Sequence, residues 1–99
     1  MPDRKFGLDQ KVLEEIIKTI KKYPVDKIIL YGSRALGTFR DASDIDLTLV
    51  SSSMSFSDLL ALENELDDLL LPYKIDLSVM NTIHKQSLLD HIRQHGVEL

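Results

Sequence analysis

The sequence contains no cysteine among its 99 residues. This absence excludes a disulfide framework and any zinc site built from thiolates. No apolar run approaches the length of a membrane span, and the first residues, Met1 to Lys5, are charged and polar instead of forming an apolar signal segment. We therefore expect a cytoplasmic protein that does not associate with membranes.

Basic residues are also in the minority, because 12 Lys and Arg face 16 Asp and Glu and give a net charge of -4. That balance disfavours a nucleic-acid-binding module that relies on neutralising phosphates. Hydrophobic residues make up 43% and charged residues 28% of the chain, which is ordinary for a globular protein. We expect one domain over 1–99, and a domain of this size buries roughly two-thirds of its unfolded surface.

Helical and extended patterns alternate along the chain. Apolar residues at helical spacing predict a first helix over 10–23, a second between the capping pair Ser55 and Asp58 and Pro72, and a third from Asn81 or Thr82 to Gly96. The leucine stripe of the second helix is interpreted as core and comprises Leu59, Leu62, Leu66, Leu69 and Leu70. Extended patterns predict strands over 26–31, 45–50 and 73–79, and a short edge strand over 97–99. A short helical turn is expected over 33–36, directly after the first strand.

This order predicts an α+β protein with an α/β-like alternation of elements. The sheet should be small and mixed, with three to four strands backed by helices on one face. The short connection between 26–31 and 45–50 allows these two strands to be antiparallel. Alternation at period two then turns Ile45, Leu47, Ile75 and Leu77 toward the helices.

The chemistry is concentrated between residues 28 and 49. Asp44 and Asp46 alternate with apolar residues, so both project from the same side of a strand. Neighbouring carboxylates repel unless a positive group lies between them, and Mg²⁺ binds carboxylates together with phosphate oxygens. Gly32 and Ser33 end the preceding strand in a turn that can bring backbone N–H groups close to phosphate. The combination indicates phosphoryl or nucleotidyl transfer.

A third acid, Asp76, lies in the middle of the strand over 73–79, where Asp is disfavoured. Each acid alone has an ordinary alternative. Asp44 can be a turn residue, Asp46 a solvated strand residue, and Asp76 an exposed acid paired with Lys74. The conjunction of a Gly-Ser turn, an Asp-x-Asp strand and a later strand Asp favours a catalytic cluster.

Two further candidates are weaker. Arg34 can contact a triphosphate through its fork of donors, and the alternative is a solvated surface side chain. His84, His91 and His95 recur at helical spacing and are interpreted as a partly exposed helix face. Zinc is disfavoured there because no thiolate or matching acid cluster accompanies them.

The spacing of these motifs resembles the nucleotidyltransferase superfamily that includes DNA polymerase beta and kanamycin nucleotidyltransferase. The shared pattern is Gly32-Ser33, then ten residues, then Asp44-Ile45-Asp46-Leu47, and later Ile75-Asp76-Leu77. The whole chain is most similar to the minimal nucleotidyltransferases, the MNT proteins of bacteria and archaea. The resemblance implies a nucleotidyltransferase fold, two Mg²⁺ ions bound by the three aspartates, and an NTP whose phosphates contact Gly32, Ser33 and Arg34. Leu36 stands where relatives often carry arginine, so one phosphate or acceptor contact is missing.

Many MNT proteins are antitoxins that attach AMP to a tyrosine of a HEPN-domain toxin. The resemblance therefore implies a protein adenylyltransferase that uses ATP and modifies a hydroxyl of such a partner, within a homo- or hetero-oligomer. We expect no second domain within these 99 residues to enclose a small-molecule pocket, which favours a protein acceptor. Two alternatives remain open, namely transfer to a small molecule across a homodimer and an antitoxin that inhibits by binding without catalysis.

Overall fold

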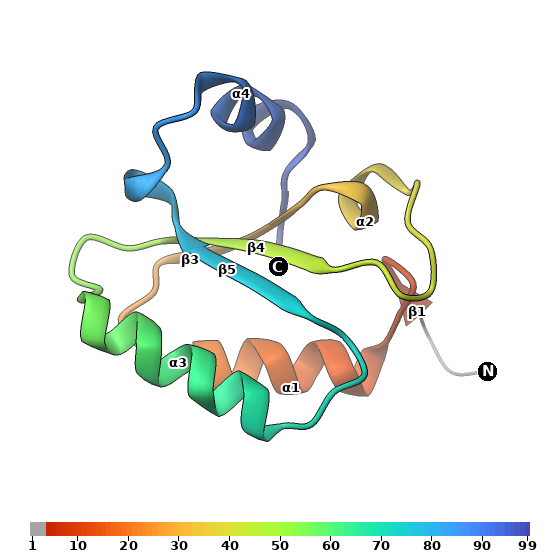
Figure 1. The fold of residues 1–99 in the computed structure, drawn as a ribbon, viewed down its shortest axis with the longest axis horizontal. Coiled ribbons are helices and arrows are strands. Elements are labelled where there is room, and N and C mark those ends of the chain that lie inside the picture. Colours follow the sequence, from red (N-terminus) through yellow and green to blue (C-terminus); the bar gives the residue numbers. More distant parts are fainter. Residues whose placement is uncertain (1–3) are drawn as a thin grey trace.

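A computed structural model describes residues 4–99, and the prediction that the N-terminus lacks a signal segment falls partly on residues 1–3, outside that range. The helices and strands follow one another as predicted, with a small hairpin added at the start (Figure 1). They are β1 (Arg4–Lys5), β2 (Leu8–Asp9), α1 (Gln10–Ile20), β3 (Lys27–Tyr31), α2 (Ser33–Leu36), β4 (Ile45–Val50), α3 (Phe56–Asp68), β5 (Ile75–Val79), the 3₁₀ turn η1 (Met80–Thr82), α4 (Gln86–His95) and β6 (Val97–Glu98).

The main sheet has four strands in the order β5-β4-β3-β6. Strand β3 is antiparallel to both β4 and β6, whereas β4 and β5 run parallel, joined by the crossover through α3. The predicted α+β class, the mixed sheet and the short edge strand near the C-terminus are therefore confirmed. The parallel pair lies at the β5 edge of the sheet, which leaves β5 with a neighbour on one side only.

Helices α1 and α3 lie together on one face of the sheet, and α2 and α4 lie on the other (Figure 1). The predicted layer of helices on one face is therefore formed by α1 and α3. The structure adds α2 and α4 on the second face, which they cover in part. The core forms under α1 and α3, where the apolar side chains of the strands meet those of the helices. Its fully buried members include Leu8, Ile16, Ile20, Leu30, Ile45, Leu47, Leu49 and Leu62.

Helix boundaries follow their caps. Asp9 begins α1 by accepting the Lys11 N–H at 2.8 Å, and Ser55 with Asp58 forms the predicted capping box of α3. The predicted start of the last helix at Asn81 or Thr82 is wrong, because those residues form η1 and α4 begins after Lys85.

The C-terminal end of α3 also differs from the prediction. The helix ends at Asp68, and Leu70 takes a left-handed conformation with φ 53°. Leu70 is 87% exposed, so its assignment to the core stripe is wrong.

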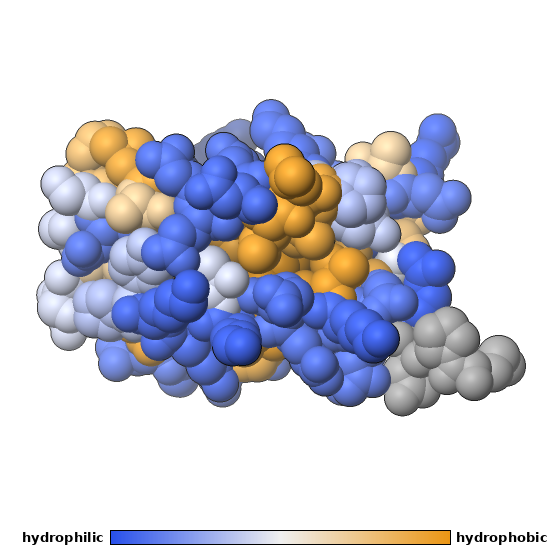
Figure 2. Space-filling model, turned by 90° about the horizontal axis from the view of Figure 1, so that it is seen from below, coloured by the Kyte–Doolittle hydropathy of each residue, from blue (hydrophilic) through white to orange (hydrophobic). Residues whose placement is uncertain are grey.

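Seen from below, the side of the molecule formed by α1 and α3 is largely polar, with an exposed apolar area near its middle (Figure 2).

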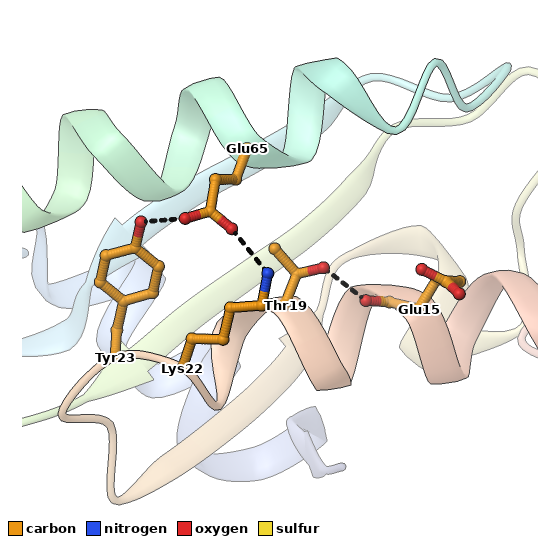
Figure 3. A network of polar contacts seen from close by, with 5 residues as sticks. All are labelled: Glu15, Thr19, Lys22, Tyr23 and Glu65. Atoms are coloured by element: carbon orange, nitrogen blue, oxygen red, sulfur yellow. Dashed lines mark hydrogen bonds and ion pairs between the residues drawn. The ribbon is translucent and has the colours of Figure 1, made fainter.

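A polar network ties the end of α1 to α3 (Figure 3). Tyr23 donates its hydroxyl to Glu65 at 2.7 Å, and Lys22 forms an ion pair with the same carboxylate at 3.1 Å. The hydrogen bond with Tyr23 and the one from Lys22 both lower the pKa of Glu65. Because both helices are on the core side, this network stabilises the packing of α1 against α3 and lies away from the candidate acids on the opposite face of the sheet. Within residues 4–99, no helix has both the length and the apolar character needed to cross a bilayer.

The core side can be tested on two leucines of α3. Leu62 is fully buried and Leu60 is 45% exposed. Leu62→Ala should lower the free energy of unfolding by about 2–5 kcal/mol, because it leaves a cavity in the core. Leu60→Ala should change it by less than about 0.5 kcal/mol. Urea unfolding of both variants checks this, and equal losses would show that α3 packs with another face.

Candidate active site

The register of the sheet brings two of the predicted acids into one row. Asp46 of β4 pairs with Asp76 of β5 across the parallel ladder, and with Tyr31 of β3 on its other side. Their neighbours along the strands, Leu30 and Leu47, are buried in the core. Because successive side chains alternate between faces, the row Tyr31–Asp46–Asp76 lies on the face opposite α1 and α3. Paired Cα atoms on adjacent strands are about 5 Å apart, so the two carboxylates are close neighbours.

Asp44 lies just before β4 and is exposed, as is Asp76, whereas Asp46 between them is half-buried. Burial raises the pKa of Asp46, and the charges of Asp76 and Asp44 raise it further. Both causes disfavour the ionised form of this carboxyl, because it is partly removed from water and lies close to like charges. As their side chains stand, no three His, Asp or Glu residues in the described range converge closely enough to hold a metal ion.

The Gly-Ser turn lies directly beside this row. Gly32 has φ 77° and ψ -156°, a combination that is accessible almost only to glycine. A Cβ atom built on Gly32 would collide with the carboxylate of Asp46. Glycine is therefore needed both for the backbone conformation and for the close approach of the turn to the acid.

The hydrogen bonds of the turn differ from the prediction. The Gly32 N–H is donated to Nε2 of His91 at 2.9 Å, so in this structure it is not free for phosphate. Ser33 begins α2 and is half-buried, and its hydroxyl has no hydrogen-bond partner among residues 4–99. The turn therefore still offers the Ser33 hydroxyl as a donor to a ligand.

Arg34 does not join the other predicted site residues. Its side chain is 1% exposed, and its guanidinium is committed to backbone carbonyls. Nη1 donates to Phe6 at 2.8 Å, while Nε and Nη2 donate to Ser43 at 3.2 and 2.9 Å, and Nη2 also reaches Asp41 at 3.3 Å. The alternative of a solvated side chain is therefore wrong, and the predicted contact with a triphosphate would require the guanidinium to leave these carbonyls.

Two aromatic rings enclose the same guanidinium. Cζ of Arg34 lies 5.2 Å from the ring centroid of Phe39 and 5.0 Å from that of Tyr73, within the range of cation–π contacts. Arg34 thus ties the loop between α2 and β4 to the N-terminal hairpin and to the start of β5. This loop leads into Asp44 and Asp46, so Arg34 acts on the site through the backbone that carries the acids.

Four residues near the acids were not predicted from the sequence as members of the site. Tyr31 stands in the acid row, where burial and the charges of Asp76 and Asp46 raise its pKa. In the next row, the Ser78 hydroxyl donates to buried Thr48 at 3.0 Å. His91 reaches the turn from α4, although its helical spacing with His95 indicates only a helix face. The spacing of the histidines within α4 does not show which strand the helix will cover, so the contact of His91 with the turn could not be predicted from the sequence.

A surface cavity of about 320 Å³ lies at the β5 edge of the sheet, between β5 and α3. Tyr73 and Lys74 line it from the approach to β5, and Glu63 and Asp67 line it from α3. The cavity is therefore on the α3 side of the sheet, whereas the side chains of the acid row are on the other face. Asp76 is itself exposed at this edge.

Comparison with known proteins places the chain among nucleotidyltransferases. The family model described as polymerase beta, nucleotidyltransferase matches residues 14–99. A protein of Methanocaldococcus jannaschii named as a protein adenylyltransferase is 38% identical over 77 residues, which cover 76% of this chain and 78% of the relative.

Two solved structures share the fold. One is a chain from a toxin–antitoxin complex with AMP-PNP, with TM-score 0.70 and 23% identity over 86% of this chain and 69% of that one. The other comes from the complex of a tri-AMPylated Shewanella oneidensis HEPN toxin with its MNT antitoxin, with TM-score 0.66 and 20% identity over 90% of this chain and 69% of that one.

The structural role of Arg34 predicts a loss of stability on conservative substitution. In Arg34→Lys a single nitrogen replaces the three that donate to the carbonyls of Phe6, Asp41 and Ser43, and the charge stays buried. The substitution should therefore lower the free energy of unfolding by about 3 kcal/mol. Arg40→Lys, at an exposed side chain of the same loop, should change it by less than about 0.5 kcal/mol. Urea unfolding measures both. A variant at Arg34 that unfolds like the parent but loses ATP binding would show instead that Arg34 is a ligand.

The crowding of the acids predicts that Asp46→Asn stabilises the protein in the presence of a chelator. The folded pKa of Asp46 is raised, so the folded state binds protons more readily than the unfolded state and the parent loses stability as the pH rises through that pKa. The gain should be about 1 kcal/mol or less at neutral pH, because solvent screens a half-exposed group. It should disappear below about pH 4, where the carboxyl is protonated in both states. Thermal unfolding against pH checks this, and a variant that unfolds would make Asp46 a structural residue.

Proposed function

The chain belongs to the polymerase beta family of nucleotidyltransferases, and from that premise we propose that it transfers AMP from ATP to a hydroxyl group of a partner protein, with Mg²⁺ held by Asp44, Asp46 and Asp76. Membership of the family confirms the resemblance drawn from the motif and identifies the chain as an enzyme by descent. The substrate, the metal and the acceptor are the proposed parts.

The observation that carries the proposal is the pairing of Asp46 with Asp76 beside the Gly32 turn. The donor set fits a hard divalent cation, because it consists of carboxylate oxygens only. Burial raises the pKa of Asp46, and the charges of Asp76 and Asp44 raise it further; a cation between the three acids would offset that repulsion. Asp44 and Asp76 are exposed, so their side chains are free to rotate toward Asp46.

Two Mg²⁺ ions bound by these acids would neutralise the triphosphate and lower the pKa of the acceptor hydroxyl. The residues of the chain position the reactants. The Ser33 hydroxyl would donate to a phosphate oxygen, while Asp76 would accept the proton of the acceptor hydroxyl and pass it to solvent. The acceptor oxygen then bonds to the α-phosphorus as the bond to the bridging oxygen breaks, and pyrophosphate leaves. Most of the rate enhancement would come from positioning and charge neutralisation.

A protein acceptor is favoured by the openness of the site. Asp76 is exposed on the edge strand β5, and Asp44 is exposed as well, so a side chain of another protein can reach them. The relative from Methanocaldococcus jannaschii is named as a protein adenylyltransferase, and one structure of the same fold contains an AMPylated HEPN toxin. We therefore take a tyrosine of a HEPN-domain partner as the acceptor, since a phenol ionises more readily than an aliphatic hydroxyl.

The proposal predicts the formation of a covalent adduct. The chain, a co-expressed HEPN partner, ATP and Mg²⁺ should add the mass of one or more AMP units to a partner tyrosine, as measured by mass spectrometry. Asp44→Asn should reduce the rate of addition about 10²-fold or more, because it removes charge stabilisation at the reacting centre. Asp68→Asn removes an equal charge from an exposed position on α3 and should leave the rate unchanged.

Other results would choose between the remaining functions. If the parent binds and silences the partner with no mass added, and Asp44→Asn protects equally well, the chain acts as a stoichiometric antitoxin. Transfer that proceeds without a partner protein, with AMP recovered on a small molecule, would reject the protein acceptor and keep the transferase.

A further inference from the structure

Helix α4 is fixed to the middle of the sheet by the strand that follows it. Strand β6 pairs with β3 through Ile29 with Glu98 and Leu30 with Val97, and the Leu99 N–H donates to the carbonyl of Ile28 at 2.8 Å. Between α4 and β6, the chain passes so close to the sheet that a Cβ atom on Gly96 would collide with the Ile29 side chain. The position of α4 over β3 is therefore determined by backbone pairing and leaves little freedom for the helix to shift.

His91 projects from α4 onto the end of β3. Its ring meets the ring of Tyr31 edge to face, with centroids 6.1 Å apart, and lies tilted against His95 at 5.4 Å. Nε2 accepts the Gly32 N–H at 2.9 Å. Since that nitrogen is the acceptor, the neutral ring carries its proton on Nδ1. This single contact joins residues 59 positions apart and connects α4 to the turn of the candidate site.

Gly32 needs such a partner because glycine has more backbone freedom than any other residue. Its φ of 77° and ψ of -156° are one of several conformations open to a glycine, so hydrogen bonds must select it. Its carbonyl accepts the Leu36 N–H at 3.1 Å, and its N–H is held by His91. Both ends of the residue are thus fixed, and the direction in which Ser33 leaves the strand is fixed with them.

We propose that His91 is a positioning residue of the nucleotide site, which sets the Gly32–Ser33 turn so that the Ser33 hydroxyl points to the phosphates, and through which α4 controls nucleotide affinity. The proposal rests on the proposed function for the identity of the ligand. Two consequences follow from it. Loss of the acceptor at position 91 weakens nucleotide binding without unfolding the protein, and a different side chain that accepts the same N–H restores binding.

A matched pair of substitutions separates the acceptor from the packing. His91→Phe keeps a ring against Tyr31 and removes the acceptor, whereas His91→Gln gives up the ring and keeps an oxygen that can accept from Gly32. Gln94→Ala, at an exposed position of the same helix, is the control. If the Phe variant does not fold, His91→Ala replaces it.

The measurements are the dissociation constant of Mg²⁺–ATP by calorimetry, the KM and kcat of transfer, the thermal midpoint and the amide resonance of Gly32 in the absence of nucleotide. His91→Phe should raise the dissociation constant and KM about tenfold, the ratio expected for one ordinary hydrogen bond, with kcat and the thermal midpoint little changed. Its Gly32 amide proton should move upfield. His91→Gln should restore the affinity and most of the shift, and Gln94→Ala should match the parent.

Three results would overturn the proposal. Equal or tighter ATP binding by a folded His91→Phe variant would show that His91 competes with the nucleotide or has no influence on it. An unmoved Gly32 amide would show that the contact is not formed in solution. A Gln variant as weak as the Phe variant would assign the effect to ring packing. A parent that binds no ATP rejects the proposed function, and the Gly32 amide in the two variants then decides separately whether His91 fixes the turn.

Discussion

Backbone pairing between β4 and β5 is the constraint on which the site depends. These strands have one face buried under α1 and α3, so a slip of one residue would turn Leu47 and Leu77 out of the core and place Asp46 and Asp76 into it. Burial of the leucines therefore holds the register, and the register holds two carboxylates side by side at a cost that appears in the raised pKa of Asp46. The apolar face of the sheet thus maintains the repulsion on which the function of the other face depends.

The loop between α2 and β4, which leads to these acids, is held by a buried cation instead of by apolar packing. Arg34 gives its hydrogen bonds to the carbonyls of Phe6, Asp41 and Ser43, and two aromatic rings cover its guanidinium. A charge buried in this way is tolerated only when all its donors are satisfied. The requirement makes the loop conformation specific, and Asp44 enters the site from a defined direction.

The turn on the other side of Asp46 is held from α4. Gly32 must approach the carboxylate too closely for any side chain, and the contact with His91 satisfies its N–H. The three components of the site are therefore each fixed by a different part of the chain. The core fixes the acids, Arg34 of α2 fixes the loop by its bonds to that loop and to the N-terminal hairpin, and the C-terminal helix fixes the turn.

The sequence by itself determined the order of elements, the mixed sheet, the shared face of Asp46 and Asp76 and the Gly-Ser turn beside them. These features follow from local periodicity and from the spacing of residues, both of which can be read within short stretches of the sequence. Only the tertiary structure decided that Arg34 is buried, that Leu70 lies outside the core, and that His91 takes the Gly32 N–H. Each of these depends on contacts between segments distant in the sequence: an arginine after a turn has the same local pattern whether solvent or three carbonyls surround it. For Arg34 the choice is made by the N-terminal hairpin and the loop, whose carbonyls surround the guanidinium. For His91 it is made by the pairing of β6 with β3, which places α4 over the turn. In both cases the deciding contacts come from segments far away in the sequence.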